Sequence, residues 1–442
     1  MLRSRGVTDL CGPDSTSESR FTAYVERLAA ALSHADRTAP FRAYCTGLML
    51  PGERKSVEPM AARVDPSRVS AAHQSLHHFV AKAAWDDGAV LDAVRDLVLP
   101  PLLEGGPLRF WILDDTGMPK KSRNSVGVTR QYCSQIDKQD NCQVAVSLSL
   151  ATDRASLPIA FRLYLPEPCA NDPIRRAKAG IPDAVAFQTK PTIALDQIRA
   201  AVAVRLPPGV VLMDAGYGTD TDLRAGIGAL GLIYVADTQS STSLWPPGVT
   251  PLPPKPWRDT GRPPKLLRCG PGHEPVAAQT LAQGLAPATW HTVTWREGTN
   301  APLTSRFAAV RVHPAHRDNE RAELRPAEWL LVEWPEDEDE PTKYWLSTLP
   351  DTASLDGLVA TAKGRWRIER NDLELKQELR LGHYEGRGWR GFHHHATLCI
   401  AAYGFLVRKR AAIPPSAPPR TGCREAPALP EGYRPRGAPA AP

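Results

Sequence analysis

The spacing of apolar residues predicts a helical region at the start of the chain. Its apolar residues recur at intervals of three and four positions: Phe21, Tyr24, Val25, Leu28, Ala29 and Leu32. This is the period of an amphipathic helix, and similar patterns continue to about residue 104. We expect a helical N-terminal domain over 15–104, after a flexible N-terminus at 1–14. Arg54 and Lys55 follow a Pro-Gly turn inside it, which favours a solvated loop, with phosphate contact as the alternative.

Short apolar runs bounded by turn residues begin after Gly105, and they predict strands. Four of them follow one another without helices between them: PLRFWILDD, VTRQYC, CQVAVSLSLA and LPIAFRLYLP. Strands in direct succession favour an antiparallel meander. The first run ends in Asp114 and Asp115. The polar segments TGMPKKSRNSVG and CANDPIRRAKAGIPDA are predicted to be a loop and turn-prone chain.

Helical and strand patterns alternate from Pro191 onward. A helix opened by this proline precedes the strand GVVLMDAGYG, which ends at Asp214, and the helix TDTDLRAGIGAL and the strand GLIYVADT follow. Such alternation favours parallel strands joined by crossover helices. Residues 105–238 are therefore predicted to form the first part of an α/β sheet domain. It is a mixed sheet with helices on both faces, in which an antiparallel edge joins a parallel half.

The alternation breaks after residue 239, where WPPGVTPLPPKPWRDTGRPPK is predicted to be irregular surface chain. TWHTVTW, SRFAAVRV and AEWLLVEWP then predict strands, so residues 239–342 are expected to be an all-β insertion. It carries six tryptophans, and core packing is the favoured role for any one of them. Strand and helix patterns resume over 343–412, the second part of the sheet domain. The Pro-rich segment 413–442 predicts a disordered tail.

Four charged residues share one narrow stripe of the helix predicted after Gly364: Arg365, Glu369, Asp372 and Lys376. Their spacing of four, three and four residues matches the helical period. Apolar residues flank the stripe on both sides. One interpretation therefore holds it inward at the edge of a core, where a carboxylate needs a cation or a metal. The other is a surface helix with ion pairs between residues four apart.

Composition narrows the class of protein. The chain has 442 residues, 42% of them hydrophobic, and a formal charge of +6, which fits a packed globular protein with a polyanionic partner but does not establish one. Its eight cysteines form no CxxC pairs, which favours a reducing compartment without a zinc site or a disulfide framework. No run approaches the ~18 apolar residues of a membrane helix. We expect a cytoplasmic, nucleoid-associated protein that does not enter a membrane.

Three carboxylates stand where ligands commonly bind. Asp115 ends the first predicted strand, Asp214 ends a later parallel strand, and Glu369 lies on a late helix. Ligands of open α/β sheets bind beyond the carboxyl ends of strands. Oxygen ligands select hard cations, here two Mg²⁺ ions, with Mn²⁺ as the alternative. Such a pair activates a water or hydroxyl against a phosphodiester, so the predicted chemistry is phosphoryl transfer on nucleic acid.

These motifs resemble bacterial insertion-sequence transposases of the DDE type, whose catalytic domain is ribonuclease H-like. One large group carries the helix signature Tyr-x2-Arg-x3-Glu-x6-Lys. Here Arg365, Glu369 and Lys376 keep that register, with Ala362 in place of the tyrosine. A more detailed resemblance is to insertion-sequence family 701. It is carried by GERKSVEPMAARV, HQSLHHFV, DDTGMPKKS, QDNCQVAVSLSLA, MDAGYG and LKQELRLGHYEGRGWRGFHHHATLCIAAYGFL.

The resemblance implies roles for individual residues. Asp115, Asp214 and Glu369 are expected to hold the metal ions, with Asp115 rather than Asp114 as the first ligand. Basic residues are expected to contact DNA: Arg365, Lys376, Lys120, Lys121, Arg123 and Arg130. In some relatives the insertion supplies a tryptophan that stacks on a flipped base. The run His393–His395 is expected to pack or to contact phosphate rather than to bind a metal.

The implied activity is cleavage at terminal inverted repeats and joining of the ends to target DNA, by a homodimer that uses Mg²⁺. The helical N-terminal domain is expected to read the DNA ends. Two alternatives stay open. One is a catalytically silent or domesticated DNA-binding protein, and the other is a metal-dependent nuclease without strand transfer.

Overall fold

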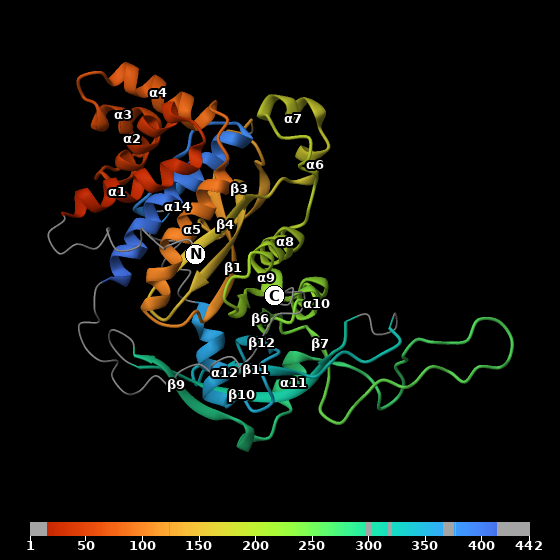
Figure 1. The fold of residues 1–442 in the computed structure, drawn as a ribbon. Coiled ribbons are helices and arrows are strands. Elements are labelled where there is room, and N and C mark those ends of the chain that lie inside the picture. Colours follow the sequence, from red (N-terminus) through yellow and green to blue (C-terminus); the bar gives the residue numbers. More distant parts are fainter. Residues whose placement is uncertain are drawn as a thin grey trace, which may run out of the picture. The chain divides into compact units, whose positions relative to one another are not determined.

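A computed structural model describes residues 16–122, 124–297, 302–316, 321–365, 375 and 377–412 (Figure 1). The chain divides into two compact units. Unit 1 comprises Met1–Leu108, Asp114–Gln197 and Arg367–Pro414, and unit 2 comprises Arg109–Leu113, Ile198–Trp366 and Pro415–Pro442. Within the described ranges, no helix has both the length and the apolar character needed to cross a membrane.

Unit 1 begins with helices, as the apolar spacing predicts. They are α1 (Ser17–Ala29), α2 (Thr38–Met49), α3 (Val57–Val64), α4 (Val69–Ala81) and α5 (Asp87–Glu104). Polar side chains fix two of the helix starts. Thr16 Oγ1 accepts the backbone N–H of Ser19 at 3.2 Å, and Asp86 Oδ1 accepts that of Ala89 at 3.1 Å. Such caps satisfy backbone N–H groups that have no partner inside the helix.

The long helix α14 (Trp389–Ala411) is the central element of unit 1, because α2, α4, α5 and strand β4 (Ser156–Leu163) all pack against it. Nearly all of its residues from Gly391 to Phe405 are buried. The Tyr24 hydroxyl donates to the Ala401 carbonyl at 3.0 Å. Gly404 makes room for that tyrosine, since a Cβ there would lie 2.7 Å from the Tyr24 hydroxyl oxygen.

Three successive histidines at the start of α14 bind three different neighbours. His393 Nε2 accepts the backbone N–H of Leu163 at 3.3 Å. The His394 ring stacks on Trp85 with 3.6 Å between centroids and contacts the Val80 and Trp85 carbonyls. His395 Nδ1 lies 2.8 Å from the Tyr44 hydroxyl. The histidines therefore pack α14 against β4, the α4–α5 connection and α2. Packing is one of the two roles expected from the sequence, and phosphate contact was the other.

The strands of unit 1 are antiparallel, as predicted. β3 (Lys138–Ala151) pairs with β2 (Thr129–Cys133) through its first half and with β4 through its second half. Three further helices follow the meander: α6 (Glu167–Ala170), α7 (Pro173–Ala179) and α8 (Lys190–Ala203), the last of which extends into unit 2.

Unit 2 contains the parallel part of the sheet. The first half of β1 (Phe110–Pro119) pairs in parallel with β5 (Val210–Met213), and β5 pairs in parallel with β6 (Tyr234–Thr238). Antiparallel strands continue from β6 in the order β12 (Lys343–Ser347), β11 (Glu328–Trp334), β10 (Pro302–Pro314), β7 (Ser243–Trp245) and β8 (Val276–Ala277). β9 (His291–Glu297) also pairs with β10. The helices of this unit include α9 (Ala215–Gly218), α10 (Thr221–Ala229), α11 (Ala278–Gln283) and α12 (Leu355–Ala362).

Three predicted segments differ from the structure. β1 continues to Pro119, although a loop was predicted from Thr116, because Thr116 is buried and the Gly117 N–H donates to Ser134 Oγ at 3.2 Å. The turn-prone segment after β4 forms α6 and α7, and the Asp172 carboxylate caps α7. The insertion is not all-β, because α11 interrupts its strands and packs into a cluster with Leu244 and Tyr344.

The prediction of a solvated loop at Lys55 is also wrong. Its side chain is buried, and its ammonium donates to the carbonyl of Leu48 at the end of α2 and, at 2.6 Å, to that of Glu378. Carbonyls at the end of a helix carry partial negative charge, so they stabilise a buried cation. Arg54 is exposed and pairs with Glu385 at 3.2 Å.

Acid is expected to destabilise unit 1 through His394 and His395. Burial lowers the pKa of each imidazole from its usual 6.5 to about 4, so the unfolded chain takes up these protons at higher pH than the folded chain does. Stability is then lost as the pH falls from 6.5 to 4, by about 3 kcal/mol per histidine. Thermal unfolding followed across this range should show the loss, and H394Q should make it shallower. An equal slope for wild type and H394Q would contradict the assignment.

Candidate functional site

Two neighbouring acids lie in the middle of β1, where the strand passes from unit 2 into unit 1. Alternate residues of a strand share a face, so Asp114 lies on the face of Phe110, and Asp115 lies on the face of Trp111. The four strand residues before the acids are buried, whereas both acids are partly exposed. The two carboxylates therefore sit in different environments although they are adjacent in sequence.

The Phe110 face of β1 is covered by the short turn η5 (Lys363–Arg365). A Cβ on Gly364 would lie 2.7 Å from the Phe110 ring and 3.3 Å from the Leu212 side chain. A residue larger than glycine would be forced away from the sheet there. The segment predicted as the acidic helix starts at this turn.

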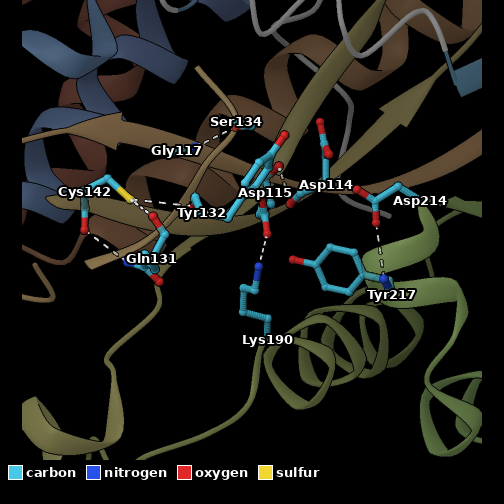
Figure 2. Close-up of polar contacts among 11 residues, drawn as sticks. Asp114, Asp115, Gly117, Gln131, Tyr132, Ser134, Cys142, Lys190, Asp214 and Tyr217 are labelled. Carbon is cyan, nitrogen blue, oxygen red and sulfur yellow. Dashed lines mark hydrogen bonds and ion pairs between the residues drawn. The ribbon is translucent and has the colours of Figure 1, made fainter. Parts of the chain in front are cut away.

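Asp115 has a cationic partner from α8. The Lys190 ammonium donates to Asp115 Oδ2, as Figure 2 shows, and both side chains belong to unit 1. Lys190 is the first residue of α8, and Pro191 behind it has the fixed φ that suits a helix start. Sequence reasoning missed Lys190. Its only signal is a lysine placed directly before the proline that opens the helix.

Asp214 ends the buried strand β5 and begins α9. Its backbone is extended, and its Oδ1 accepts the backbone N–H of Tyr217 at 3.2 Å (Figure 2). One carboxylate oxygen is therefore oriented by a backbone N–H at the start of α9. The Tyr217 ring beneath it is buried.

A further acid, Asp237, lies near the end of β6, the strand next to β5. The pKa of Asp237 is raised to about 6, chiefly by burial; Arg365 and Lys343 oppose this rise, and the Asp214 charge contributes to it. The Trp345 side chain also hydrogen-bonds to its carboxylate. Asp237 thus connects Arg365 electrostatically to the end of the parallel strands. Sequence reasoning missed it, although the run GLIYVADT shows an acid near the end of a strand.

A buried ion pair holds the start of the Arg365 turn. Lys363 Nζ lies 2.7 Å from both carboxylate oxygens of Glu333, and the two side chains are 13% and 8% exposed. Three aromatic rings surround the ammonium, with centroids at 4.5 Å (Trp295), 5.6 Å (Phe307) and 5.5 Å (Trp345). Cation–π attraction adds to the ion pair in this desolvated setting. Burial lowers the pKa of Lys363, and Glu333 opposes that shift.

The other residues predicted to contact DNA differ in their exposure to solvent. Lys121 and Arg130 are exposed. Lys120 is only partly exposed, its ammonium donates to the Tyr384 carbonyl, and burial lowers its pKa. Arg365 is the last residue of η5. Arg123, Glu369, Asp372 and Lys376 lie outside the described residues, so both interpretations of the charged stripe stay predictions.

The chemistry of the acids at the strand ends fits a hard divalent cation. Asp114, Asp115 and Asp214 offer only carboxylate oxygens, which are the ligands that Mg²⁺ and Mn²⁺ prefer. Among the residues that the structure describes, no three His, Cys, Asp or Glu side chains are grouped to hold a metal. The third predicted ligand, Glu369, is not among those residues.

A buried parallel strand pair followed by carboxylates, inside a mixed sheet, defines an α/β protein with an acidic site. The family model described as DDE superfamily endonuclease matches residues 27–302, so the chain belongs to the DDE superfamily endonucleases. The probable transposase for insertion sequence element IS701 of Microchaete diplosiphon is 30% identical over 169 residues. That alignment spans 38% of this chain and 41% of the relative.

The match confirms the resemblance to DDE enzymes and to insertion-sequence family 701. It also confirms the fold class, a mixed α/β sheet of ribonuclease H-like type that follows N-terminal helices. Endonucleases, the class that this family description names, are enzymes that cut nucleic acid.

The aromatic surroundings of Lys363 allow a test by double substitution. K363M should destabilise unit 2 by about 3 to 5 kcal/mol, because it leaves the Glu333 carboxylate buried without a partner. K363M/E333L replaces both charges with apolar side chains and should recover most of that loss. Chemical denaturation of the single and double variants measures the coupling. Equal losses for K363M and the double variant would show that the ion pair does not hold this turn.

Proposed function

We propose that this chain is the transposase of an insertion sequence. It cuts DNA at terminal inverted repeats, exposes 3′-hydroxyl groups and joins them to target DNA by transesterification. The observation that carries the proposal is the match to DDE superfamily endonucleases over residues 27–302, which contain the acids of the paired strands β1 and β5. The likeness to the probable transposase of IS701 supports the same activity.

The proposed metal site consists of three carboxylates, supplied by β1, by Asp214 and by Glu369. Two Mg²⁺ ions, or Mn²⁺ ions, supply activation of the attacking oxygen and stabilisation of the leaving oxygen when bound. Asp214 contributes a carboxylate that the Tyr217 N–H already orients. A preoriented ligand loses less conformational entropy on binding.

Asp115 is the first acid that the family resemblance implies, but the geometry supports Asp114. Asp114 and Asp115 lie on opposite faces of β1, because alternate residues of a strand share a face. Asp114 also shares its face with Phe110, against which Gly364 packs at the start of the Glu369 segment. Asp115 faces the other way and is neutralised by Lys190. We therefore propose Asp114 as the ligand and Asp115 as an acid that fixes α8 to β1.

Basic side chains complete the proposed site. Arg365 contacts the phosphate beside the scissile bond, and its charge is balanced by the Asp237 carboxylate when the phosphate is absent. Lys376, Lys121 and Arg130 are proposed to contact the DNA backbone. Lys120 instead anchors the Tyr384 carbonyl. The N-terminal helical domain reads the element ends, and two copies of the chain act on paired ends as a homodimer.

Cleavage of labelled element ends with Mg²⁺ tests this proposal. D214N and E369Q should each lower the rate by at least about 10²-fold, because each removes a charged ligand. D114N should lower the rate as strongly, and D115N should lower it much less. The reverse order would identify Asp115 as the ligand.

D183N changes an exposed acid of unit 1 and serves as the matched control. The proposed metal site would be ruled out if D214N or E369Q cleaved as fast as wild type, or if D114N and D115N both did. If the wild type cleaves the ends but does not join them to target DNA, the protein is a nuclease without strand transfer.

Lys190 provides an independent test of which acid binds the metal. If Asp115 is not a ligand, K190M should leave the Mg²⁺ concentration at half-maximal rate within about twofold of wild type. If Asp115 is a ligand, the Lys190 ammonium competes with the metal for its carboxylate. K190M should then lower the Mg²⁺ concentration at half-maximal rate by more than twofold relative to wild type. A titration of initial cleavage rate against Mg²⁺ separates the two results. K178M, at an exposed lysine of unit 1, is the control.

A further inference from the structure

The segment between β7 and β8 carries a concentration of positive charge that the proposed catalytic site does not use. Residues 252–268, here named the basic arm, contain five cations and one acid: Lys255, Arg258, Arg262, Lys265, Arg268 and Asp259. The formal charge of the arm is +4, against +6 for the whole chain of 442 residues. The arm therefore combines five cations with a single acid within one short stretch of the chain.

The base of the basic arm is closed by backbone pairing. Leu252 and Arg268 exchange two hydrogen bonds, of 2.8 and 3.0 Å, and Arg268 Nε donates to the Pro253 carbonyl at 3.0 Å. The neighbouring Leu267 N–H donates to the Arg321 carbonyl at 2.8 Å, in the segment before β11. The arm, drawn in green in Figure 1, therefore projects from a defined anchor in unit 2.

The tip of the basic arm is organised by an exposed tryptophan. The Trp257 ring is 49% exposed, and its indole N–H donates to the Gly261 carbonyl at 3.1 Å. Between them the backbone turns through left-handed conformations, with φ of 59° at Asp259 and 76° at Gly261. Five prolines in the arm also restrict its backbone: Pro253, Pro254, Pro256, Pro263 and Pro264. Restriction of this kind lowers the entropy lost when the cations engage a partner.

The composition of the arm favours a nucleic-acid backbone over a protein surface. The side chains of Lys255, Arg258, Arg262 and Lys265 are all exposed, and the only large apolar side chains exposed with them are those of Trp257 and Leu266. A protein interface needs a contiguous apolar centre. Closely spaced, exposed cations instead match the dense row of phosphates on duplex DNA. Lysine and arginine contacts to phosphate fix position without reading sequence.

We propose that the basic arm binds the phosphate backbone of duplex DNA and supplies sequence-independent affinity to the enzyme. This rests on the proposed function, because it assumes that DNA is the substrate. Arg268 closes the base, and Lys255, Arg258, Arg262 and Lys265 make the phosphate contacts. Element ends and target DNA share this backbone chemistry, so the arm engages either duplex.

Binding in the absence of metal tests the arm separately from cleavage. The full chain is titrated, with a chelator present, against a labelled duplex of random sequence and against one carrying the element end. K255Q/R258Q/R262Q/K265Q should weaken binding to both duplexes by roughly 10- to 100-fold and lower the slope of log affinity against log salt by about 3 to 4. K255R/K265R, which keeps the charge, should bind as wild type does.

A charge-matched control separates the arm from net charge. K138Q/K178Q/R205Q/K409Q removes four exposed cations from elsewhere on the described chain and should change the salt slope much less. The substituted side chains of the arm are exposed, so K255Q/R258Q/R262Q/K265Q should unfold at the same temperature as wild type.

Each outcome has a distinct meaning. Equal salt slopes for the arm variant and the control variant would overturn the arm as a DNA contact. A loss confined to the element-end duplex would show sequence reading rather than backbone binding and would also overturn the proposal. If the arm variant keeps full DNA affinity but changes sedimentation, the arm binds protein instead. A wild type that binds through the arm but never cuts element ends would refute the proposed function and leave the arm intact.

Discussion

The parallel pairing of β1 with β5 is the constraint on which the described site depends. The residues of both strands up to their acids are buried, so neither strand has a water-exposed face that would let it shift along its neighbour. The Trp111 indole donates to the Pro207 carbonyl at 3.0 Å, and Gly209 lets the two chains approach, since a Cβ there would lie 2.8 Å from the Trp111 ring. With this register fixed, the identity of the acid on each face follows from the alternation of the strand.

Positive charge in this protein has two separate uses. Three lysines are buried or partly buried: Lys55, Lys120 and Lys363. Backbone carbonyls bind the first two ammonium groups, and a carboxylate binds the third. Burial lowers the pKa of each. These cations hold together segments that are distant in the sequence, because a buried ammonium must find acceptors wherever the fold provides them. The cations of the basic arm are exposed instead. The buried lysines therefore stabilise the fold, and the exposed cations of the arm are available to bind a polyanion.

The connection between the aromatic ion pair and Arg365 shows how the insertion serves the parallel sheet. Glu333, Phe307 and Trp345 come from three antiparallel strands, and Lys363 enters among them from the end of α12. Two residues later the chain reaches Arg365, whose charge acts on Asp237 at the end of β6. The insertion thus holds the turn η5, whose last residue is Arg365, through a buried ion pair.

The sequence by itself determined the class of the fold, most of its helices and strands, the family and the acids at the strand ends. It could do so because periodicity, turn residues and motifs such as MDAGYG are local properties of the chain. It did not determine that Lys190 faces Asp115, that Asp237 is buried beside Arg365, or that Lys55 is a buried packing residue. Those facts depend on which distant segment covers each side chain. Only the tertiary structure decides burial, and burial decides whether a charged group is a solvated residue, a structural ion pair or part of a site.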